Sequence, residues 1–217
     1  SIPSRSARQM EDGSSPSFSE KQTLDACAYC FDVLINSFDA KHKIPQPDLP
    51  KSDFPLFVTW KIYNNRKQYW NLRGCIGTFQ KQPLLSGLKD YALTSAFKDT
   101  RFDPMSQDEV TSLAVNTSFL TNFEDAKDCF DWEIGTHGIT IRFQNLKGKS
   151  FSATYLPEVC PEQGWTKEEC LESLVRKSGF RGRINSSLWN TIKLTRYQSV
   201  KAKMTYKEYL ENRKDSK

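Results

Sequence analysis

The chain has 217 residues, of which 37% are hydrophobic and 26% charged, so it can form one domain with a sizeable core or two small ones. Ten Gly, ten Pro and 12% aromatic residues exclude a collagen-like, coiled-coil or wholly disordered chain. A mean hydropathy of −0.63 and the lack of an apolar run of roughly 18 residues predict no membrane span. Residues 1–22 contain no continuous apolar stretch of the signal-peptide kind, so we expect a cytoplasmic or nuclear protein.

The positive charge is concentrated at the C-terminal end. Residues 167–217 contain 13 Lys and Arg against 6 Asp and Glu, whereas the whole chain has a net charge of +5. Such asymmetry can mark a phosphate or nucleic-acid surface. These charges are interleaved with Glu on the faces of expected helices and strands, however, so a solvated surface is the simpler interpretation and nucleic-acid binding ranks last among the functions considered.

Hydrophobic periodicity, turn residues and capping motifs divide the chain into elements. Residues 1–18 have little apolar content and are expected to form a flexible arm. The following elements are then predicted in chain order: a helix from Ser19 or Thr23 to Phe38, strands over 56–62 and 68–79, a helix from Pro83 to before Asp99, a short helix after Ser106, a strand over 113–120, an acidic and aromatic connection over 122–133, a hairpin of 139–143 with 150–156, a helix from Thr166 to Gly179, a long strand over 192–204 and a terminal helix after Thr205.

The strands arrive mostly in hairpin order, with helices between some of them. This order favours an α+β fold with antiparallel pairing over a doubly wound parallel sheet.

The stretch Leu72–Phe79 is the most informative part of the chain. Gly74 and Gly77 interrupt a strand pattern, as expected where the backbone bulges or where a ligand or another backbone approaches closely. Cys75 lies between them, close to Arg73, and a neighbouring guanidinium favours the reactive thiolate form. The alternative interpretation is a small buried cysteine in a kinked strand.

Six segments together resemble the AMMECR family, named for the chromosomal region of Alport syndrome, midface hypoplasia and elliptocytosis. The resemblance extends from about Cys27 to Tyr209 and includes an intact Leu-Arg-Gly-Cys-Ile-Gly signature. The segments are Leu72–Phe79, Ala96–Phe102 with Pro104, Leu120–Asp125, Asp131–Ile139, Thr154–Val159 and Thr191–Tyr197.

The resemblance implies an α+β protein with two antiparallel-sheet subdomains and flanking helices, in which the larger subdomain contains both termini. It implies a larger subdomain of residues 19–74 and 134–217 and a smaller inserted one of residues 75–133, with the signature near their junction. It implies no established activity. Because the domain is associated with Memo-like and radical-SAM proteins in microbial relatives, it also implies a possible partner of one of those kinds.

Carried over by position, the resemblance implies a site formed by the signature, a second loop at Arg101 and a third at Lys177. Each of the basic residues also has a structural interpretation, because Arg101 can pair with a carboxylate or cap the preceding helix and Lys177 can neutralise a helix C-terminus. The candidate catalytic residue is the Cys75 thiol. The candidate ligand-binding residues are Arg73, Gly74, Gly77, Arg101, Lys177 and His137, and His137 is the least secure because microbial relatives often have a different residue at this position.

Other motifs are weaker. Cys27 and Cys30 match C-x-x-C, but their spacing puts both sulfurs on the packed side of a helix. The positions of the six cysteines fit no secreted disulfide framework, so we expect free thiols. With only two His and no EF-hand loop, no metal site is expected, and without a glycine-rich phosphate loop no nucleotide cofactor is expected.

Two functional hypotheses of different classes therefore rank above nucleic-acid binding. In the first, a cleft between the subdomains binds a small anionic ligand or a modified group at a reactive Cys75, which makes a thiol-dependent enzyme one candidate. In the second, the protein is a non-catalytic nuclear or cytosolic interaction or regulatory module whose aromatic-rich loop around Phe123, Phe130 and Trp132 binds a partner protein. The expected partner is thus an unknown small molecule in the first hypothesis and a protein in the second.

Overall fold

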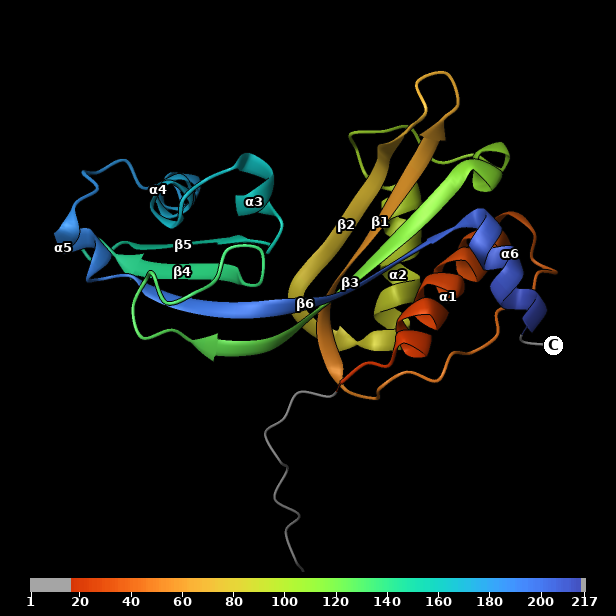
Figure 1. Cartoon of the computed structure of the whole chain (residues 1–217), viewed down its shortest axis with the longest axis horizontal. Helices are drawn as coiled ribbons and strands as arrows, with labels where there is room; N and C mark the ends of the chain where they lie inside the picture. Colours follow the sequence, from red (N-terminus) through yellow and green to blue (C-terminus); the bar gives the residue numbers. More distant parts are fainter. Residues whose placement is uncertain (1–16, 216–217) are drawn as a thin grey trace, which may run out of the picture.

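The computed structural model describes residues 17–215 and has the expected α+β class, with helices flanking one antiparallel sheet (Figure 1). Its strands are β1 (Asp53–Asn64), β2 (Tyr69–Pro83), β3 (Leu113–Asp125), β4 (Gly138–Gln144), β5 (Ser150–Tyr155) and β6 (Lys193–Thr205). Its helices are α1 (Glu20–Phe38), α2 (Leu84–Phe97), the 3-10 helix η1 (Gln107–Ser112), α3 (Val159–Gln163), α4 (Lys167–Lys177), α5 (Ser186–Trp189) and α6 (Tyr206–Asp215).

The six strands follow the order β2-β1-β3-β6-β4-β5, and every neighbouring pair is antiparallel. The long strands β3 and β6 are paired at the centre of this order. Figure 1 shows that they run through both halves of the molecule, with α1, α2 and α6 beside one half and α3, α4 and α5 over the other. The two halves therefore share one continuous sheet.

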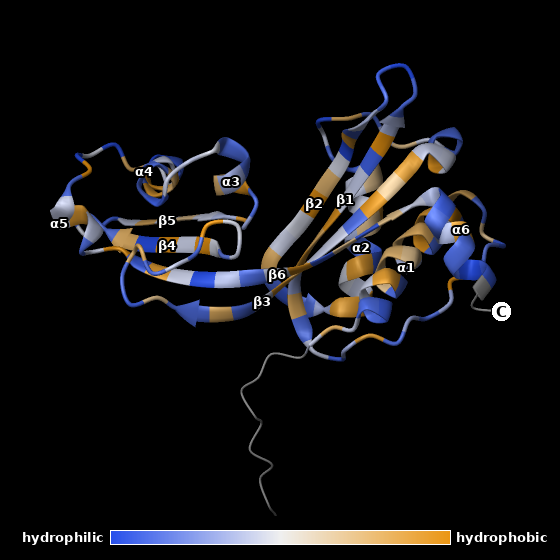
Figure 2. Cartoon of the chain, in the orientation of Figure 1, coloured by the Kyte–Doolittle hydropathy of each residue, from blue (hydrophilic) through white to orange (hydrophobic). Residues whose placement is uncertain are grey.

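The larger half has a core between its helices and β1, β2, β3 and part of β6. The alternation predicted for β1 is confirmed, since Leu56, Val58 and Trp60 are fully buried while the intervening residues are partly exposed. Helix α1 begins at Ser19, whose side chain accepts a hydrogen bond from the Gln22 backbone N–H in a complete capping box. Figure 2 shows that hydrophobic residues are plentiful along α1 and α2, whereas α6 is largely hydrophilic.

The smaller half has a separate core made by β4, β5, α4 and their connections, with buried residues that run from Cys129 to Leu194. This grouping differs from the division implied by the resemblance, because Leu84, Leu88 and Val115 lie in the core of the larger half. The physical reason is that α2 packs on β1 and β2, the hairpin that precedes it. Both ends of the described chain, α1 and α6, lie in the larger half, as expected.

Three further details differ from the sequence-based predictions. β3 continues to Asp125, because Glu124 and Asp125 pair with β6 after a break in register, so the expected connection is shorter. The short helices α3 and α5 were not predicted. Residues 1–16 of the expected arm lie outside the described residues, but Phe18 packs against Phe54 and Phe119 and so belongs to the core rather than to an arm.

Across residues 17–215, no helix combines the length and apolar character that a membrane crossing requires.

Candidate functional site

The signature glycines are required by close backbone approaches. A Cβ atom at Gly74 would lie 2.0 Å from the Ser95 carbonyl oxygen of α2. A Cβ atom at Gly77 would lie 2.3 Å from the Leu56 carbonyl oxygen of the neighbouring strand. The pairing of β2 with β1 also shifts register between Gly74 and Leu72, which leaves Arg73 as the extra residue of a bulge. Helix α2 therefore packs directly onto β2 beside Cys75.

Cys75 differs from the other cysteines of the chain, because it is partly exposed and the other five are buried. The Thr59 hydroxyl, directly opposite on β1, donates a hydrogen bond to Cys75 Sγ at 3.0 Å. The Cys75 backbone N–H donates to Asp99 Oδ2 at 2.9 Å. The thiol is thus held at one strand position from two sides and remains open to solvent.

Arg101 lies beside Cys75 and is bound to the same carboxylate. Its Nε and Nη2 donate to the Asp99 oxygens at 3.0 and 2.7 Å, and Nη2 also donates to the Cys75 carbonyl oxygen at 3.2 Å. The hydrogen bonds from the guanidinium, with help from the Cys75 N–H, hold the pKa of Asp99 well below its usual range. The Arg101 side chain is 56% exposed, so part of the guanidinium faces solvent beside the Cys75 backbone.

Arg73 is engaged elsewhere. Its Nε and Nη2 donate to the two Glu109 oxygens of η1 at 2.6 and 3.0 Å. Burial is the largest single effect on Glu109 and opposes its ionisation, but the hydrogen bonds and charge of Arg73 together with the hydrogen bonds from Ser106 outweigh it and lower the pKa of that carboxyl. The bulge explains this orientation, because it turns Arg73 out of the alternation that would align it with Cys75. In the structure Arg73 joins β2 to η1.

His137 and Lys177 both lie in the smaller half. His137 Nδ1 accepts a hydrogen bond from the Glu133 N–H at 2.9 Å, and burial together with nearby Arg196 lowers the pKa of the imidazole. Lys177 Nζ donates to the Thr154 carbonyl oxygen at 2.7 Å and lies 4.5 Å from the centre of the Tyr155 ring. Among the described residues, no hydrogen bond, ion pair or ring contact joins either side chain to Cys75. Of the candidate basic residues, Arg101 alone contacts Cys75 in the described chain, through the backbone carbonyl oxygen.

A polar row crosses the sheet next to this group. Cys75 pairs with Thr59, Thr59 with Asn116, and Asn116 with Lys203, so these four residues occupy adjacent strands and point to one face of the sheet. The spacing between strands is about 4.8 Å, which places the Asn116 position roughly 10 Å from Cys75. Sequence reasoning missed the row, because the pairing of β1 with β3 and of β3 with β6 joins segments far apart in the chain.

A cavity of about 480 Å³ lies between the sheet of the larger half and α3 of the smaller half. Thr59, Asn116 and Lys203 of the row line it, whereas Cys75, at the end of the row, lies beside it and is not a lining residue. Lys201 Nζ donates to Glu158 across it at 2.6 Å, whereas Lys61 and Lys203 form no ion pair within residues 17–215. The cavity is lined by Thr59, Lys61, Asn116, Thr117, Ser118, Glu158, Glu162, Lys201, Ala202 and Lys203. Its volume suits a small organic ligand, and its lysines favour an anionic one.

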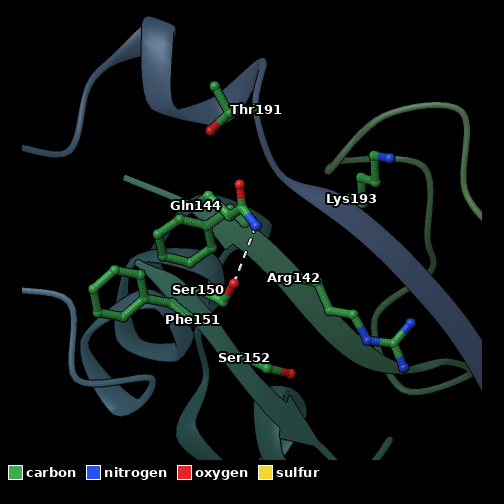
Figure 3. Close-up of a pocket in the computed structure, with 8 residues that line it drawn as sticks. Arg142, Gln144, Ser150, Phe151, Ser152, Thr191 and Lys193 are labelled. Atoms are coloured by element: carbon green, nitrogen blue, oxygen red, sulfur yellow. Dashed lines mark hydrogen bonds between the residues drawn. The ribbon is translucent and has the colours of Figure 1, made fainter. Parts of the chain in front are cut away.

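A larger hollow of about 690 Å³ lies in the smaller half, where β4 and β5 meet the start of β6 (Figure 3). Arg142 and Lys193 supply its positive charge, and Gln144 Nε2 donates to Ser150 Oγ across its floor at 3.2 Å. None of its lining residues is a cysteine, histidine or carboxylate. The hollow can bind an anion, but its serine and threonine hydroxyls have no histidine or carboxylate among the lining residues to act as a general base.

The structure corrects the expected aromatic docking loop. Trp132 is only 1% exposed, and its Nε1 donates to the Cys129 carbonyl oxygen inside the core of the smaller half. Phe130 packs against the same core, and Phe123 is exposed but stacks on Tyr197. Trp132 therefore cannot anchor a partner, because the hydrophobic core of this half needs its side chain.

The packed C-x-x-C pair is confirmed. Cys27 and Cys30 are fully buried in α1, and burial raises the pKa of the Cys27 thiol to about 11. Within the described part of the chain, no group of three or more His, Cys, Asp or Glu side chains is arranged to hold a metal ion.

Comparison with known proteins places these features in a family. The AMMECR1 family model matches residues 27–202. An uncharacterised protein of Arabidopsis thaliana is 48% identical over 187 residues, which cover 86% of each chain. An uncharacterised protein of Schizosaccharomyces pombe is 41% identical and covers 86% of this chain and 94% of its own.

A crystal structure of an uncharacterised protein from Pyrococcus horikoshii has the same fold. It matches with a TM-score of 0.62 at 25% identity and covers 85% of this chain and 91% of its own. The sequence match, the extent of coverage and the shared fold all agree, and the chain belongs to the AMMECR1 family.

Proposed function

We propose that this protein binds a small anionic ligand, or an anionic group on a larger molecule, in the cavity between its halves, with Cys75 as the contacting or reacting thiol. The observation that supports this most is the position of Cys75, which is the partly exposed cysteine and pairs across the strands with Thr59, a residue that lines the cavity. The guanidinium of Arg101, which is paired with Asp99 but 56% exposed, donates to the Cys75 carbonyl oxygen and supplies further hydrogen-bond donors beside this residue.

These residues have separate roles in the proposal. Arg101, fixed in direction by Asp99, attracts the anionic part of the ligand. Lys61 and Lys203 hold negative charge further along the cavity, where Lys201 is already neutralised by Glu158. Thr59 donates its hydroxyl hydrogen to Cys75 Sγ and so fixes the direction of the sulfur, which in this proposal contacts or attacks the ligand.

Competitive alkylation with a charged and a neutral reagent tests this proposal. Iodoacetate and iodoacetamide both form an S–C bond to the thiolate and release iodide, but only iodoacetate is an anion. The ratio of their rates at Cys75, measured by peptide mass spectrometry, is compared between the folded protein and the same protein unfolded in urea. We expect the folded ratio to be roughly three- to tenfold higher, as about 1 kcal/mol of charge attraction would produce.

Arg101→Gln should return the ratio towards the unfolded value, and added salt should do the same by screening. Arg142→Gln, which removes a cation from the separate hollow of Figure 3, is the matched control and should leave the ratio unchanged. A folded ratio equal to or below the unfolded one, or a Cys75 that reacts no faster than the buried cysteines, would overturn the proposal.

A further inference from the structure

The end of the β1–β2 hairpin forms a two-stranded ribbon that projects from the molecule (Figure 1). β1 pairs with β3 only as far as Ile62, opposite Leu113. From Tyr63 onward, β1 is paired only with β2, and the chain reverses between Asn64 and Tyr69. We call residues Tyr63–Leu72 the β1–β2 ribbon. A segment of this kind has few contacts that could bury its side chains.

The ribbon nevertheless exposes large apolar and aromatic groups. Tyr69, Trp70 and Leu72 are 45%, 39% and 40% exposed. The Tyr63 and Trp70 rings pack together across the two strands, with centroids 5.1 Å apart. Exposed hydrophobic residues that lie together mark interaction sites, and Tyr and Trp are prominent among the residues that dominate binding energies.

The backbone edge of the ribbon is also open. β2 is an outermost strand of the sheet. In its middle, the Cys75 and Ile76 N–H groups donate to Asp99 Oδ2 and Ser95 Oγ at 2.9 and 3.1 Å, so that part of the edge is covered. Along Tyr69–Leu72, no residue between 17 and 215 hydrogen-bonds to the backbone on the side away from β1. An uncovered strand edge can accept another extended peptide as an additional strand.

The charge of the hairpin defines the chemistry of the occupant. Residues 54–83 contain five Lys and Arg and no Asp or Glu. Of these cations Arg73 is held by Glu109, whereas Arg66 and Lys67, in the ribbon itself, form no ion pair within the described chain. An extended segment that lies along the ribbon would thus meet exposed aromatic rings, open N–H and C=O groups and unneutralised positive charge.

We propose that the β1–β2 ribbon binds an extended acidic segment of a partner protein, which adds to β2 as a strand alongside Tyr69–Leu72. A nucleic acid would use the aromatic rings and cations but not the backbone edge, so the open edge favours a polypeptide. This surface is separate from the proposed ligand site, since it uses the open edge of Tyr69–Leu72, whereas Asp99 closes the edge at Cys75. The exposed aromatic residues that would bind a partner protein thus lie on the ribbon and not in the loop of the buried Trp132.

A library of random 12-residue peptides displayed on phage, selected on the full chain, provides the probe. We expect enrichment of Asp- and Glu-rich sequences with alternating apolar residues. Synthetic fluorescent copies of the enriched peptides should lose at least tenfold in affinity for Trp70→Ala and for the double variant Arg66→Glu with Lys67→Glu. Leu146→Ala, which removes a fully exposed apolar side chain from the β4–β5 turn, is the matched control and should bind normally.

Methylation of alternate backbone nitrogens in the peptide tests strand addition directly. Alternate N–H groups of an added strand point towards β2 and away from it. Methylation of the nitrogens that point towards β2 should abolish binding, whereas methylation of those that point away should leave it intact. The proposal is overturned if enriched peptides are not acidic, if their binding survives both ribbon variants, or if both methylation registers bind equally. Binding of an oligouridine probe that the same variants abolish, without any ribbon-dependent peptide, would instead assign the surface to single-stranded nucleic acid.

Discussion

The carboxylate of Asp99 connects the parts of the candidate site, so its removal should have a large and specific effect. It is 5% exposed and accepts hydrogen bonds from the Cys75 N–H at 2.9 Å, from the Arg101 N–H at 3.2 Å and from the Arg101 guanidinium. These bonds tie β2 to the loop after α2. We predict that Asp99→Ala destabilises the larger half and releases both Cys75 and Arg101.

The expected cost follows from the individual contacts. A hydrogen bond to a buried charged group contributes about 1.5–3 kcal/mol, and the loss of this acceptor leaves the Cys75 N–H without its partner. The ion pair with Arg101 adds about 1 kcal/mol or less, because that guanidinium is more than half exposed. Together these contacts predict a decrease of about 2–4 kcal/mol in the free energy of unfolding, or roughly 4–16 °C in melting temperature for a chain of this size.

Urea unfolding followed by tryptophan fluorescence is a suitable assay, because Trp60 and Trp132 are buried in the cores of the two different halves. Asp99→Asn, which keeps an acceptor but not the charge, should lose about half as much as Asp99→Ala. Asp103→Ala, at an exposed position in the same loop, is the control. Neutral surface substitutions scatter by about 0.5 kcal/mol. If the free energies of unfolding of Asp99→Ala and the control differ by no more than this, the assignment of Asp99 as the connecting group is refuted.

Three further predictions follow from the same structure. Gly74→Ala places a methyl group 2.0 Å from the Ser95 carbonyl oxygen, so it should lower the free energy of unfolding by about 1–3 kcal/mol or more, and an unchanged urea midpoint would contradict this. The folded-state pKa values of Asp99 and Glu109 are lowered, so the stability that these two carboxylates provide is complete above their unfolded-state pKa values of about 4. This stability is lost as the pH falls below those values. The urea midpoint should therefore fall between pH 6 and pH 2.5, and it should fall less for Asp99→Asn than for the unmodified protein. Tyr197→Phe removes a buried hydroxyl that donates to a β5 carbonyl at 2.9 Å, so it should cost about 1 kcal/mol in thermal unfolding, whereas a neutral effect would show that the hydroxyl is dispensable.

Local patterns in the sequence were sufficient for most elements and for the residues around the thiol. The capping boxes at Thr166 and Thr205 and the alternation of β1 depend on neighbours within a few positions, and the structure has them as predicted. The glycines of the signature also indicated a close approach before its partner was known. The short helices α3 and α5 gave too few residues for a periodic signal.

The pairing of distant segments could not be predicted in this way. Arg101 and Asp99 are neighbours in sequence, but their contact with Cys75 depends on the packing of α2 against β2. Trp132 appeared in the sequence as a residue of a polar, acidic loop, and only the core of the smaller half shows why it is buried. The same limitation applies to His137, which the chain brings into the smaller half and not to the thiol.

The sequence by itself determined the α+β class, the order of most strands and helices, and the identity of Cys75 as the cysteine with unusual surroundings, because these properties depend on local spacing and residue chemistry. The tertiary structure alone decided that one sheet serves both halves, that Arg73 faces Glu109 while Arg101 faces Cys75, and that the exposed aromatic groups lie on the β1–β2 ribbon. These outcomes depend on which strands pair and in what register, and a bulge of one residue at Arg73 is enough to redirect a side chain.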